Sequence, residues 1–175
     1  MTAGARPRVV LVGPMGAGKT TVAGLLADAW GVEARDTDAD VEAAEGRTVA
    51  DIFVESGEPE FRRLERGAVS EALASHDGVL ALGGGAVLDP ETREQLAGHT
   101  VVFLKVGLSD AVKRVGLGSS RPLLLGNVRG RIKTLLDERT PVYESVASLV
   151  VDTDGRTAED VAAEIREALD AKAPA

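Results

Sequence analysis

The segment GPMGAGKT at residues 13–20 constrains the fold more than any other feature of the sequence. It fulfils the pattern G-x-x-x-x-G-K-[S/T] of a phosphate-binding loop at every fixed position. The β-branched run RVVLV precedes it, and apolar residues at helical spacing (Val22, Leu25 and Leu26) follow it. Between a strand and a helix, such a loop directs backbone N–H groups and the helix N-terminus toward phosphate oxygens. The sequence therefore predicts nucleoside triphosphate binding, although this segment alone identifies no reaction.

Apolar runs alternate with helical patterns along the rest of the chain. Strands are predicted at residues 8–12, 32–35, 78–82, 100–104 and 148–151. Helices are predicted at residues 21–30, 40–45, 49–56, 58–75, 109–115, 131–138 and 158–171. Strands separated by helices imply right-handed crossovers, so we expect one three-layer α/β/α domain with a five-stranded parallel sheet, spanning residues 1–175. Segments that follow the strands should converge at the carboxyl edge of this sheet.

Charge and cysteine content limit the classes of function. The formal net charge of −8 argues against general affinity for nucleic acid or anionic membranes. No apolar run is long enough to span a membrane, and the first apolar run continues into the phosphate loop as a strand would, unlike a signal peptide. The lack of cysteine suits a reducing compartment. We therefore expect a cytoplasmic protein without nucleic-acid or membrane partners.

Acidic residues follow the second predicted strand. Asp36 and Asp38 are two residues apart, so on extended backbone their side chains would face the same way. One could hold Mg²⁺ near Lys19 and Thr20, while the other accepts a hydrogen bond from a substrate hydroxyl. The alternative is a solvated acidic turn, but placement at a strand end beside the phosphate loop favours the functional interpretation.

Arginines and a triple glycine complete the set of candidates. Arg62 shares a helix face with Glu65, Arg121 lies in a glycine-rich segment, and Arg139 follows a predicted helix. Each could be a solvent-exposed residue, yet guanidinium groups suit carboxylate and phosphate binding. GGG at residues 83–85 leaves exposed N–H groups and room for a ligand. Tyr143 is interpreted as a packing residue.

Taken in order along the chain, these motifs resemble the shikimate kinase family. The resemblance runs from about Val9 to Arg156 and rests on GPMGAGKT, DTD at residues 36–38, ADIF at 50–53, GEPEFRRLE at 57–65, LGGGA at 82–86, RPLL at 121–124 and RTPVY at 139–143. It implies a 2-3-1-4-5 sheet, a substrate-binding helical segment at about 37–66, a lid at about 116–130 and a frayed tail at about 172–175. The implied reaction is transfer of the ATP γ-phosphate to the 3-hydroxyl of shikimate, with Mg²⁺, in aromatic amino-acid biosynthesis. We expect the enzyme to act as a monomer.

The resemblance also implies roles for individual residues. Lys19, Asp38 and Arg121 would be catalytic, and Thr20 and Asp36 would surround Mg²⁺. The residues implied at ATP are Gly13, Met15, Gly16, Ala17, Gly18, Lys19, Thr20, Thr21, Arg114, Arg121 and Arg156. The residues implied at shikimate are Asp38, Phe53, Phe61, Arg62, Glu65, Gly83, Gly84, Gly85 and Arg139, with Arg62 and Arg139 on its carboxylate.

Two alternatives remain open from the sequence. The chain could phosphorylate another small polyol acid such as gluconate, or a nucleoside monophosphate; the triple glycine and the Arg62/Arg139 pair argue against both. It could also be a GTP-dependent switch that binds a protein partner, but the N-K-x-D segment by which such switches usually read guanine is missing.

Overall fold

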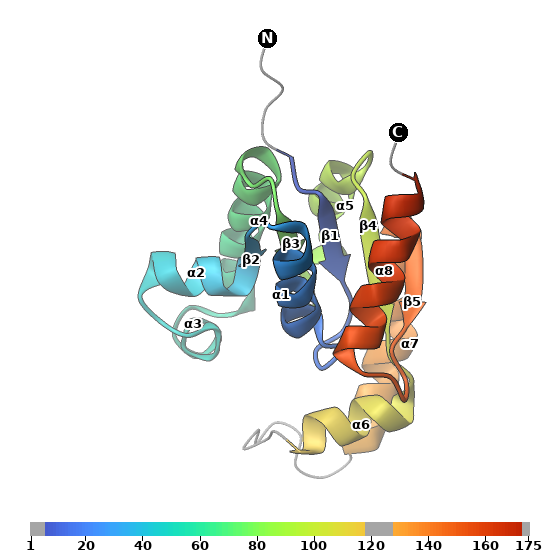
Figure 1. Ribbon diagram of the computed structural model, residues 1–175. Coiled ribbons are helices and arrows are strands. Elements are labelled where there is room, and N and C mark those ends of the chain that lie inside the picture. The colour runs from blue at the N-terminus through green and yellow to red at the C-terminus, as the bar shows by residue number, and fades with distance from the viewer. Residues whose placement is uncertain (1–5, 118–127, 173–175) are drawn as a thin grey trace.

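A parallel sheet at the centre of the protein carries the phosphate loop on its middle strand (Figure 1). The computed structural model describes residues 6–117 and 128–172. Its strands are β1 (Val9–Val12), β2 (Ala34–Asp36), β3 (Val79–Ala81), β4 (Val101–Lys105) and β5 (Leu149–Asp152). They form a 5-stranded sheet in the order β2-β3-β1-β4-β5, with all pairs parallel, which confirms the predicted topology.

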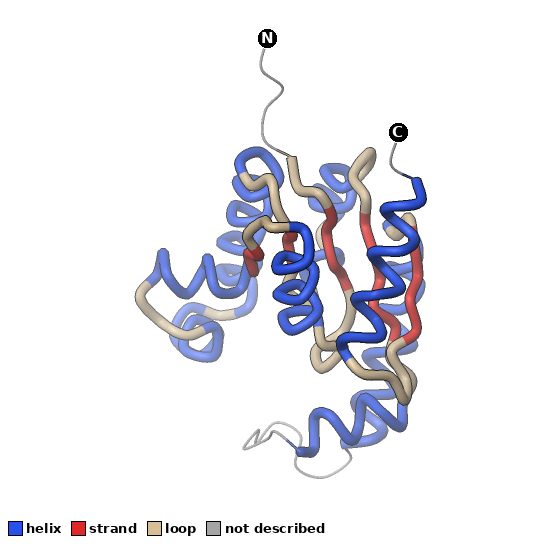
Figure 2. The backbone as a smooth tube through the Cα atoms, in the orientation of Figure 1, coloured by secondary structure: helices blue, strands red, loops and turns tan. Residues whose placement is uncertain are grey.

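Helices cover both faces of this sheet, so the chain forms the expected three layers (Figure 2). The helices are α1 (Lys19–Trp30), α2 (Thr37–Glu45), α3 (Val49–Ser56), α4 (Glu58–Ser75), η1 (Ala86–Leu88), α5 (Pro90–Leu96), α6 (Leu108–Leu117), α7 (Val128–Val146) and α8 (Ala158–Lys172). Helices α1 and α8 pack on one face, and α4, α5 and α7 pack on the other. Helices α2 and α3 project to one side of the sheet, and α6 lies below its carboxyl edge in Figure 1.

The apolar run of the first strand explains why β1 lies in the middle. All residues of β1 are buried, and alternate side chains enter the two cores: Val9 and Leu11 join α1 and α8, whereas Val10 and Val12 join α4 and α7. A strand that is apolar on both faces needs cover on both sides, which a central position provides. The loop after Val12 is thereby fixed at the middle of the carboxyl edge.

Three local predictions differ from the structure. Helix α7 was expected to end near residue 138, but it continues through Pro141 to Val146 because Val142, Tyr143 and Val146 pack into the core. Residues 86–96 had no predicted structure, yet they form η1 and α5. The predicted lid at residues 116–130 begins within α6 and ends within α7, and residues 118–127 between them lie outside the described part of the chain.

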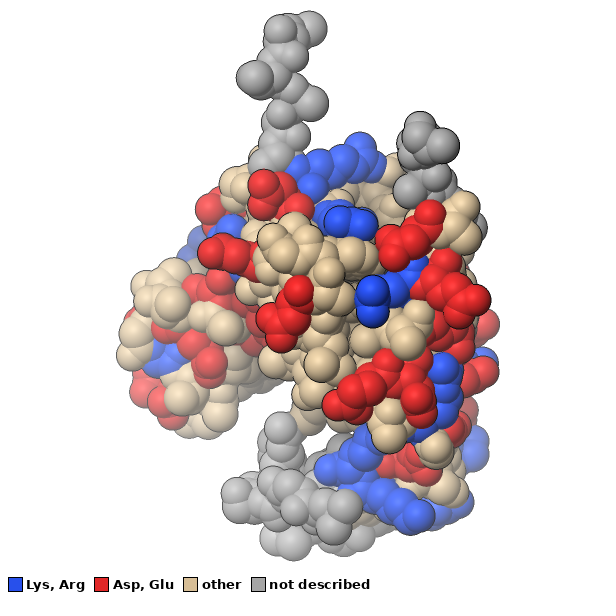
Figure 3. All heavy atoms as spheres, viewed as in Figure 1, with Lys and Arg blue, Asp and Glu red and all other residues tan. Residues whose placement is uncertain are grey.

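The surface agrees with the acidic composition. On the face shown in Figure 3, Asp and Glu side chains are interspersed with Lys and Arg, without one continuous basic area over the described residues. Among these residues, none of the helices is both long and apolar enough to cross a membrane.

Candidate active site

The phosphate loop joins β1 to α1. Gly18 precedes the helix with φ 89, a left-handed conformation that glycine adopts without strain. Lys19 begins the helix, and its Nζ donates to the carbonyl oxygens of Gly13 at 2.7 Å and Pro14 at 3.0 Å. Burial lowers the pKa of Lys19 to about 8, although the negative charges of Asp38 and Asp36 oppose this shift. The lysine is therefore held over the loop and close to the two carboxylates.

Asp36 connects the phosphate loop to the start of α2. Its Oδ2 accepts a hydrogen bond from the Thr20 hydroxyl at 3.1 Å, and its Oδ1 accepts one from the Asp38 N–H at 2.8 Å. Asp36 is thus the N-cap of α2, and Asp38 lies in the first helical turn. The expectation that both residues lie on extended backbone was wrong, because the Asp36 side chain caps a helix that begins at Thr37.

Thr20 and Asp36 offer the ligands that Mg²⁺ prefers. Their hydroxyl and carboxylate oxygens are hard donors, and they lie together at the N-terminus of α1. Mg²⁺ at phosphate sites commonly takes only one or two protein carboxylates, with phosphate and water oxygens filling the remaining positions. Within residues 6–117 and 128–172, no group of three or more His, Cys, Asp or Glu side chains could hold a metal by itself. The residues present therefore fit a metal that arrives with a nucleotide.

Asp38 is a partly buried carboxylate of the site. Burial raises its pKa above the ordinary value, and Asp36 raises it further, whereas Lys19 and Arg62 act in the opposite direction. Asp38 therefore lies between the phosphate loop and the arginine on α4. A carboxylate in this position can accept a proton or a hydrogen bond from a hydroxyl beside the phosphate loop.

The glycine segment (residues 83–85) lies between these groups, and each of its glycines faces a different one. A Cβ at Gly83 would lie 2.5 Å from Asp38 Oδ1 and 2.9 Å from Glu65 Oε2. A Cβ at Gly84 would face the phosphate loop, 3.5 Å from the Met15 nitrogen. A Cβ at Gly85 would lie 2.5 Å from Arg62 Nη2. A side chain at Gly83 or Gly85 would therefore displace a polar group of the site, whereas one at Gly84 would make an ordinary contact.

Polar contacts hold the backbone of this segment. The Gly83 N–H donates to the hydroxyl of buried Thr37 at 3.1 Å. On the opposite side, the Tyr143 hydroxyl donates to the Gly84 carbonyl oxygen at 2.5 Å. The segment is therefore attached both to the start of α2 and to α7.

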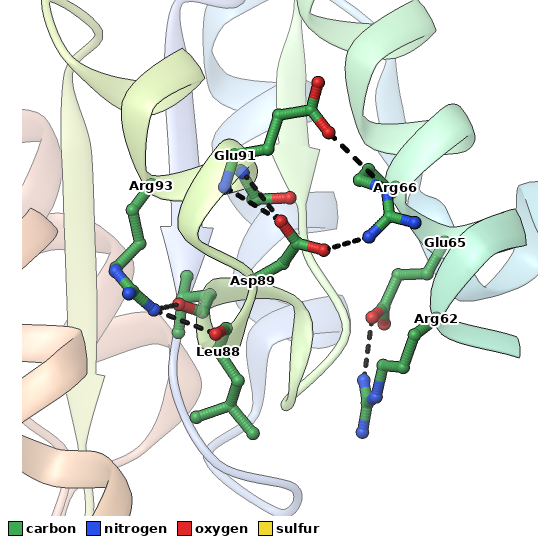
Figure 4. Close-up of polar contacts among 9 residues, drawn as sticks. Arg62, Glu65, Arg66, Leu88, Asp89, Glu91 and Arg93 are labelled. Atoms are coloured by element: carbon green, nitrogen blue, oxygen red, sulfur yellow. Dashed lines mark hydrogen bonds and ion pairs between the residues drawn. The ribbon is translucent and has the colours of Figure 1, made fainter. Parts of the chain in front are cut away.

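Arg62 and Glu65 form the predicted pair on α4 (Figure 4). Arg62 Nη1 donates to Glu65 Oε1 at 2.7 Å; the Glu65 side chain is 4% exposed, whereas that of Arg62 is 23% exposed. Burial raises the pKa of Glu65, while the charges of Arg62 and Arg139 act against that rise. Glu65 thus lies near both arginines and orients Arg62. Arg62 also lies 3.7 Å from the exposed Glu58 carboxylate, and its partly exposed guanidinium keeps donors with which it can bind an anion.

Aromatic rings lie next to this charged group. The rings of Phe53 and Phe61 are 4.8 Å apart, which places α3 against α4. The Arg62 guanidinium lies 5.4 Å from the centre of the Phe61 ring. The rings therefore give the arginine an apolar side, as expected where a small ring compound binds.

Arg114 contacts the other end of the phosphate loop. It donates to the Gly16 carbonyl oxygen at 3.1 Å and to the Thr153 carbonyl oxygen at 2.9 Å. The Asp154 carboxylate accepts the Gly107 N–H at 2.8 Å, and Asp110 accepts the Gly155 N–H at 2.9 Å. These contacts fasten the turn after β5 to the turn after β4, next to the phosphate loop.

The structure brings most of the predicted residues together at one edge of the sheet. Arg156 instead donates to the Asp152 carbonyl oxygen and pairs with Glu164 at 2.8 Å, so it closes the turn before α8. Met15 and Thr21 are exposed and Ala17 is buried, all within or beside the phosphate loop. Arg121 lies outside the described residues. The roles assigned to individual residues remain predictions.

The contacts of Tyr143 and Asp154 were missed from the sequence. Tyr143 was interpreted as a packing residue, whereas its hydroxyl binds a backbone group of the site, and the Asp154 carboxylate binds another. One signal was available for Tyr143: it follows Arg139 by four residues, so on one helix the two side chains share a face.

A phosphate loop on the central strand of a 2-3-1-4-5 sheet, with a carboxylate and arginines beside it, defines a P-loop kinase that acts on a small molecule. The family model described as shikimate kinase matches residues 15–170. The chain belongs to the shikimate kinase family.

Individual relatives agree with this assignment over nearly the whole chain. A shikimate kinase of Thermobifida fusca is 58% identical over 95% of this chain and 96% of its own length. One from Streptomyces avermitilis is 57% identical over 95% of this chain and 97% of its own length. The solved structure of shikimate kinase from Acinetobacter baumannii in complex with shikimate has a TM-score of 0.88 and 36% identity, covering 97% of this chain and 96% of the other.

Proposed function

We propose that this chain transfers the γ-phosphate of ATP to the 3-hydroxyl of shikimate, giving shikimate 3-phosphate and ADP. The observation that carries this proposal is the glycine segment, whose backbone adjoins the phosphate loop, Asp38 and Arg62. A hydroxylated carboxylic acid lying along it would have its carboxylate near the arginines and a hydroxyl near Asp38. Family membership supports the same substrate.

On the acceptor side, Arg62 and Arg139 would bind the substrate carboxylate. Glu65 holds Arg62 in place through its 2.7 Å hydrogen bond, so the guanidinium is oriented before substrate arrives. Phe53 and Phe61 would cover the carbon ring, and backbone groups of the glycine segment would also contact the substrate. Asp38 would accept the hydrogen bond of the reacting hydroxyl and take its proton as the oxygen–phosphorus bond forms.

On the donor side, the phosphate loop would bind the nucleotide phosphates through its N–H groups. Lys19 would exchange its contacts with the Gly13 and Pro14 carbonyl oxygens for phosphate oxygens and stabilise the charge that spreads over them in the transition state. Thr20 and Asp36 would hold Mg²⁺, which neutralises phosphate charge when bound. Arg114 would lie beside the base and Arg121 would reach the phosphates from the lid.

A coupled assay of ADP release tests the substrate. Purified protein is supplied with MgATP and either shikimate, gluconate or a nucleoside monophosphate, and we expect turnover with shikimate only. Asp38→Asn should lower kcat by orders of magnitude with ATP binding retained, because the amide cannot take a proton. Turnover of gluconate without turnover of shikimate would overturn the proposal.

We further propose that the enzyme acts as a monomer in the cytoplasm. Light scattering of the active enzyme measures its mass directly, and activity found only in a dimer fraction would contradict the monomer.

A further inference from the structure

Tyr143 connects the glycine segment to α7, the helix that also carries Arg139. Its side chain is 1% exposed and its ring packs against Phe103 of β4 at 5.0 Å, so the position of the hydroxyl is fixed by the core. That hydroxyl donates to the Gly84 carbonyl oxygen at 2.5 Å. The packing alone would be served equally by phenylalanine, so the hydroxyl calls for a separate explanation.

The same hydroxyl has Arg139 as a neighbour. Burial raises the pKa of Tyr143, and the Arg139 guanidinium acts against that rise through its charge and through hydrogen bonding. Arg139 lies one helical turn earlier on α7. The hydroxyl therefore contacts the glycine segment on one side and adjoins the arginine on the other.

Further contacts hold η1 and the start of α5, which follow the glycine segment in the chain (Figure 4). Arg66 pairs with Asp89, whose Oδ1 accepts the Glu91 N–H at 2.8 Å and so caps α5. Arg93 donates to the carbonyl oxygens of Val87 and Leu88 at 2.8 and 2.9 Å, which fixes η1 directly after the glycine segment. Helix α4, which carries Arg62, is thus connected to the start of α5, and Tyr143 contacts the glycine segment itself from α7.

We propose that Tyr143 is a positioning residue whose hydroxyl fixes the distance between Arg139 and the glycine segment. It thereby sets the spacing of the groups that receive the substrate carboxylate. The inference rests on the proposed function for the identity of that substrate. Tyr143 does not touch the substrate in this proposal, but acts through Arg139 and through the backbone of Gly84.

Tyr143→Phe is the direct test, because it removes the oxygen and keeps the ring. Loss of one neutral hydrogen bond should raise the KM for shikimate about 3- to 10-fold. The KM for ATP should change less than about twofold, because Gly83, next to Gly84, keeps its hydrogen bond to Thr37 and the phosphate loop keeps its own contacts. An unchanged KM for shikimate, or an equal rise for both substrates, would overturn the proposal.

Phe103→Leu is the matched control. It weakens the same ring contact and lowers stability, but it leaves the hydroxyl in place. We expect a lower Tm and a rise in the KM for shikimate well below that caused by Tyr143→Phe, because the hydroxyl keeps its bond to Gly84. If Phe103→Leu raised this KM as much as Tyr143→Phe does, general loosening of the core would explain both variants, and the positioning role would be wrong.

Two further measurements separate this inference from the proposed function. In ligand-free protein, Tyr143→Phe should shift the ¹⁵N amide resonance of Gly85, which shares a peptide unit with the Gly84 carbonyl; an unshifted resonance would contradict the contact. In an Arg139→Ala background, the effect of Tyr143→Phe on KM should shrink, whereas simple additivity would refute action through Arg139. If the wild type phosphorylated a different acid, only the proposed function would fail, because the amide shift and the KM comparison can be made with that acid.

Discussion

Gly85→Ala tests the geometry of the acceptor site with a single methyl group. The added Cβ would lie 2.5 Å from Arg62 Nη2 and 2.6 Å from Nη1. Ordinary contact between such atoms needs about 3.5 Å, so the guanidinium must move by about 1 Å. That movement breaks its alignment with Glu65 Oε1, now 2.7 Å away, and displaces it from the substrate carboxylate.

The size of the effect follows from the contact that is lost. A hydrogen bond to a charged group contributes about 1.5–3 kcal/mol, and each 1.4 kcal/mol is a factor of ten, so the KM for shikimate should rise about 10- to 100-fold. The KM for ATP should stay within about twofold, because Gly85 faces Arg62 and not the phosphate loop. Initial rates in the coupled ADP-release assay, with each substrate varied in turn, give both constants.

Gly67→Ala is the matched control for this variant. Gly67 follows Arg62 by five residues on the same helix, at an exposed position of α4 where an added Cβ meets nothing within 4 Å. It should stabilise the helix by about 0.5–1 kcal/mol and leave both KM values unchanged. If Gly85→Ala left the KM for shikimate unchanged, or raised both KM values alike, the placement of Arg62 against the glycine segment would be refuted.

Three other predictions concern the protonation of Lys19, the protonation of Asp38 and the contact of Asp154 beside the nucleotide site. As the pH rises through about 8, Lys19 of the free enzyme loses its proton and kcat/KM for ATP should fall; a profile that stays flat to about pH 10 would contradict the lowered pKa of Lys19. On the acid side, the raised pKa of Asp38 should make kcat/KM fall at a higher pH than an ordinary aspartate would. Asp154→Ala leaves the Gly107 N–H without its acceptor and should raise the KM for ATP but not the KM for shikimate. The control Asp137→Ala, which breaks an exposed ion pair with Lys133, should change neither KM. An equal change of both KM values in Asp154→Ala would reject the local role of Asp154.

Local patterns predicted β1, β3 and β4 well, because these strands are short buried apolar runs, whereas β2 (Ala34–Asp36) lies slightly later than the predicted residues 32–35. They failed where tertiary packing overrides local preference. Pro141 removes a helical hydrogen bond and predicts a helix end, yet burial of Tyr143 against Phe103 keeps α7 continuous to Val146. Conversely, Asp89 and Pro90 are a helix-start signal for α5, but that helix is too short to show a clear period.

The candidate site was predictable where a motif carries the chemistry. The phosphate loop, and the Arg62–Glu65 pair at i, i+3, follow from spacing alone. Contacts to carbonyl oxygens were not predictable, because any residue supplies such an oxygen and only the fold selects one. The Tyr143 hydroxyl on Gly84 and Arg114 on Gly16 are of this kind.

The contact between Asp154 and Gly107 also bears on the order in which the protein can become functional during synthesis. The two residues are 47 positions apart, and Asp154 comes from the turn after β5, the last strand to be made. A chain emerging from the ribosome has its phosphate loop early, but Gly107 lacks Asp154, and Arg114 lacks Thr153, until β5 has joined the edge of the sheet. We therefore expect nucleotide to stabilise the finished fold more than a nascent chain whose C-terminal portion is still untranslated.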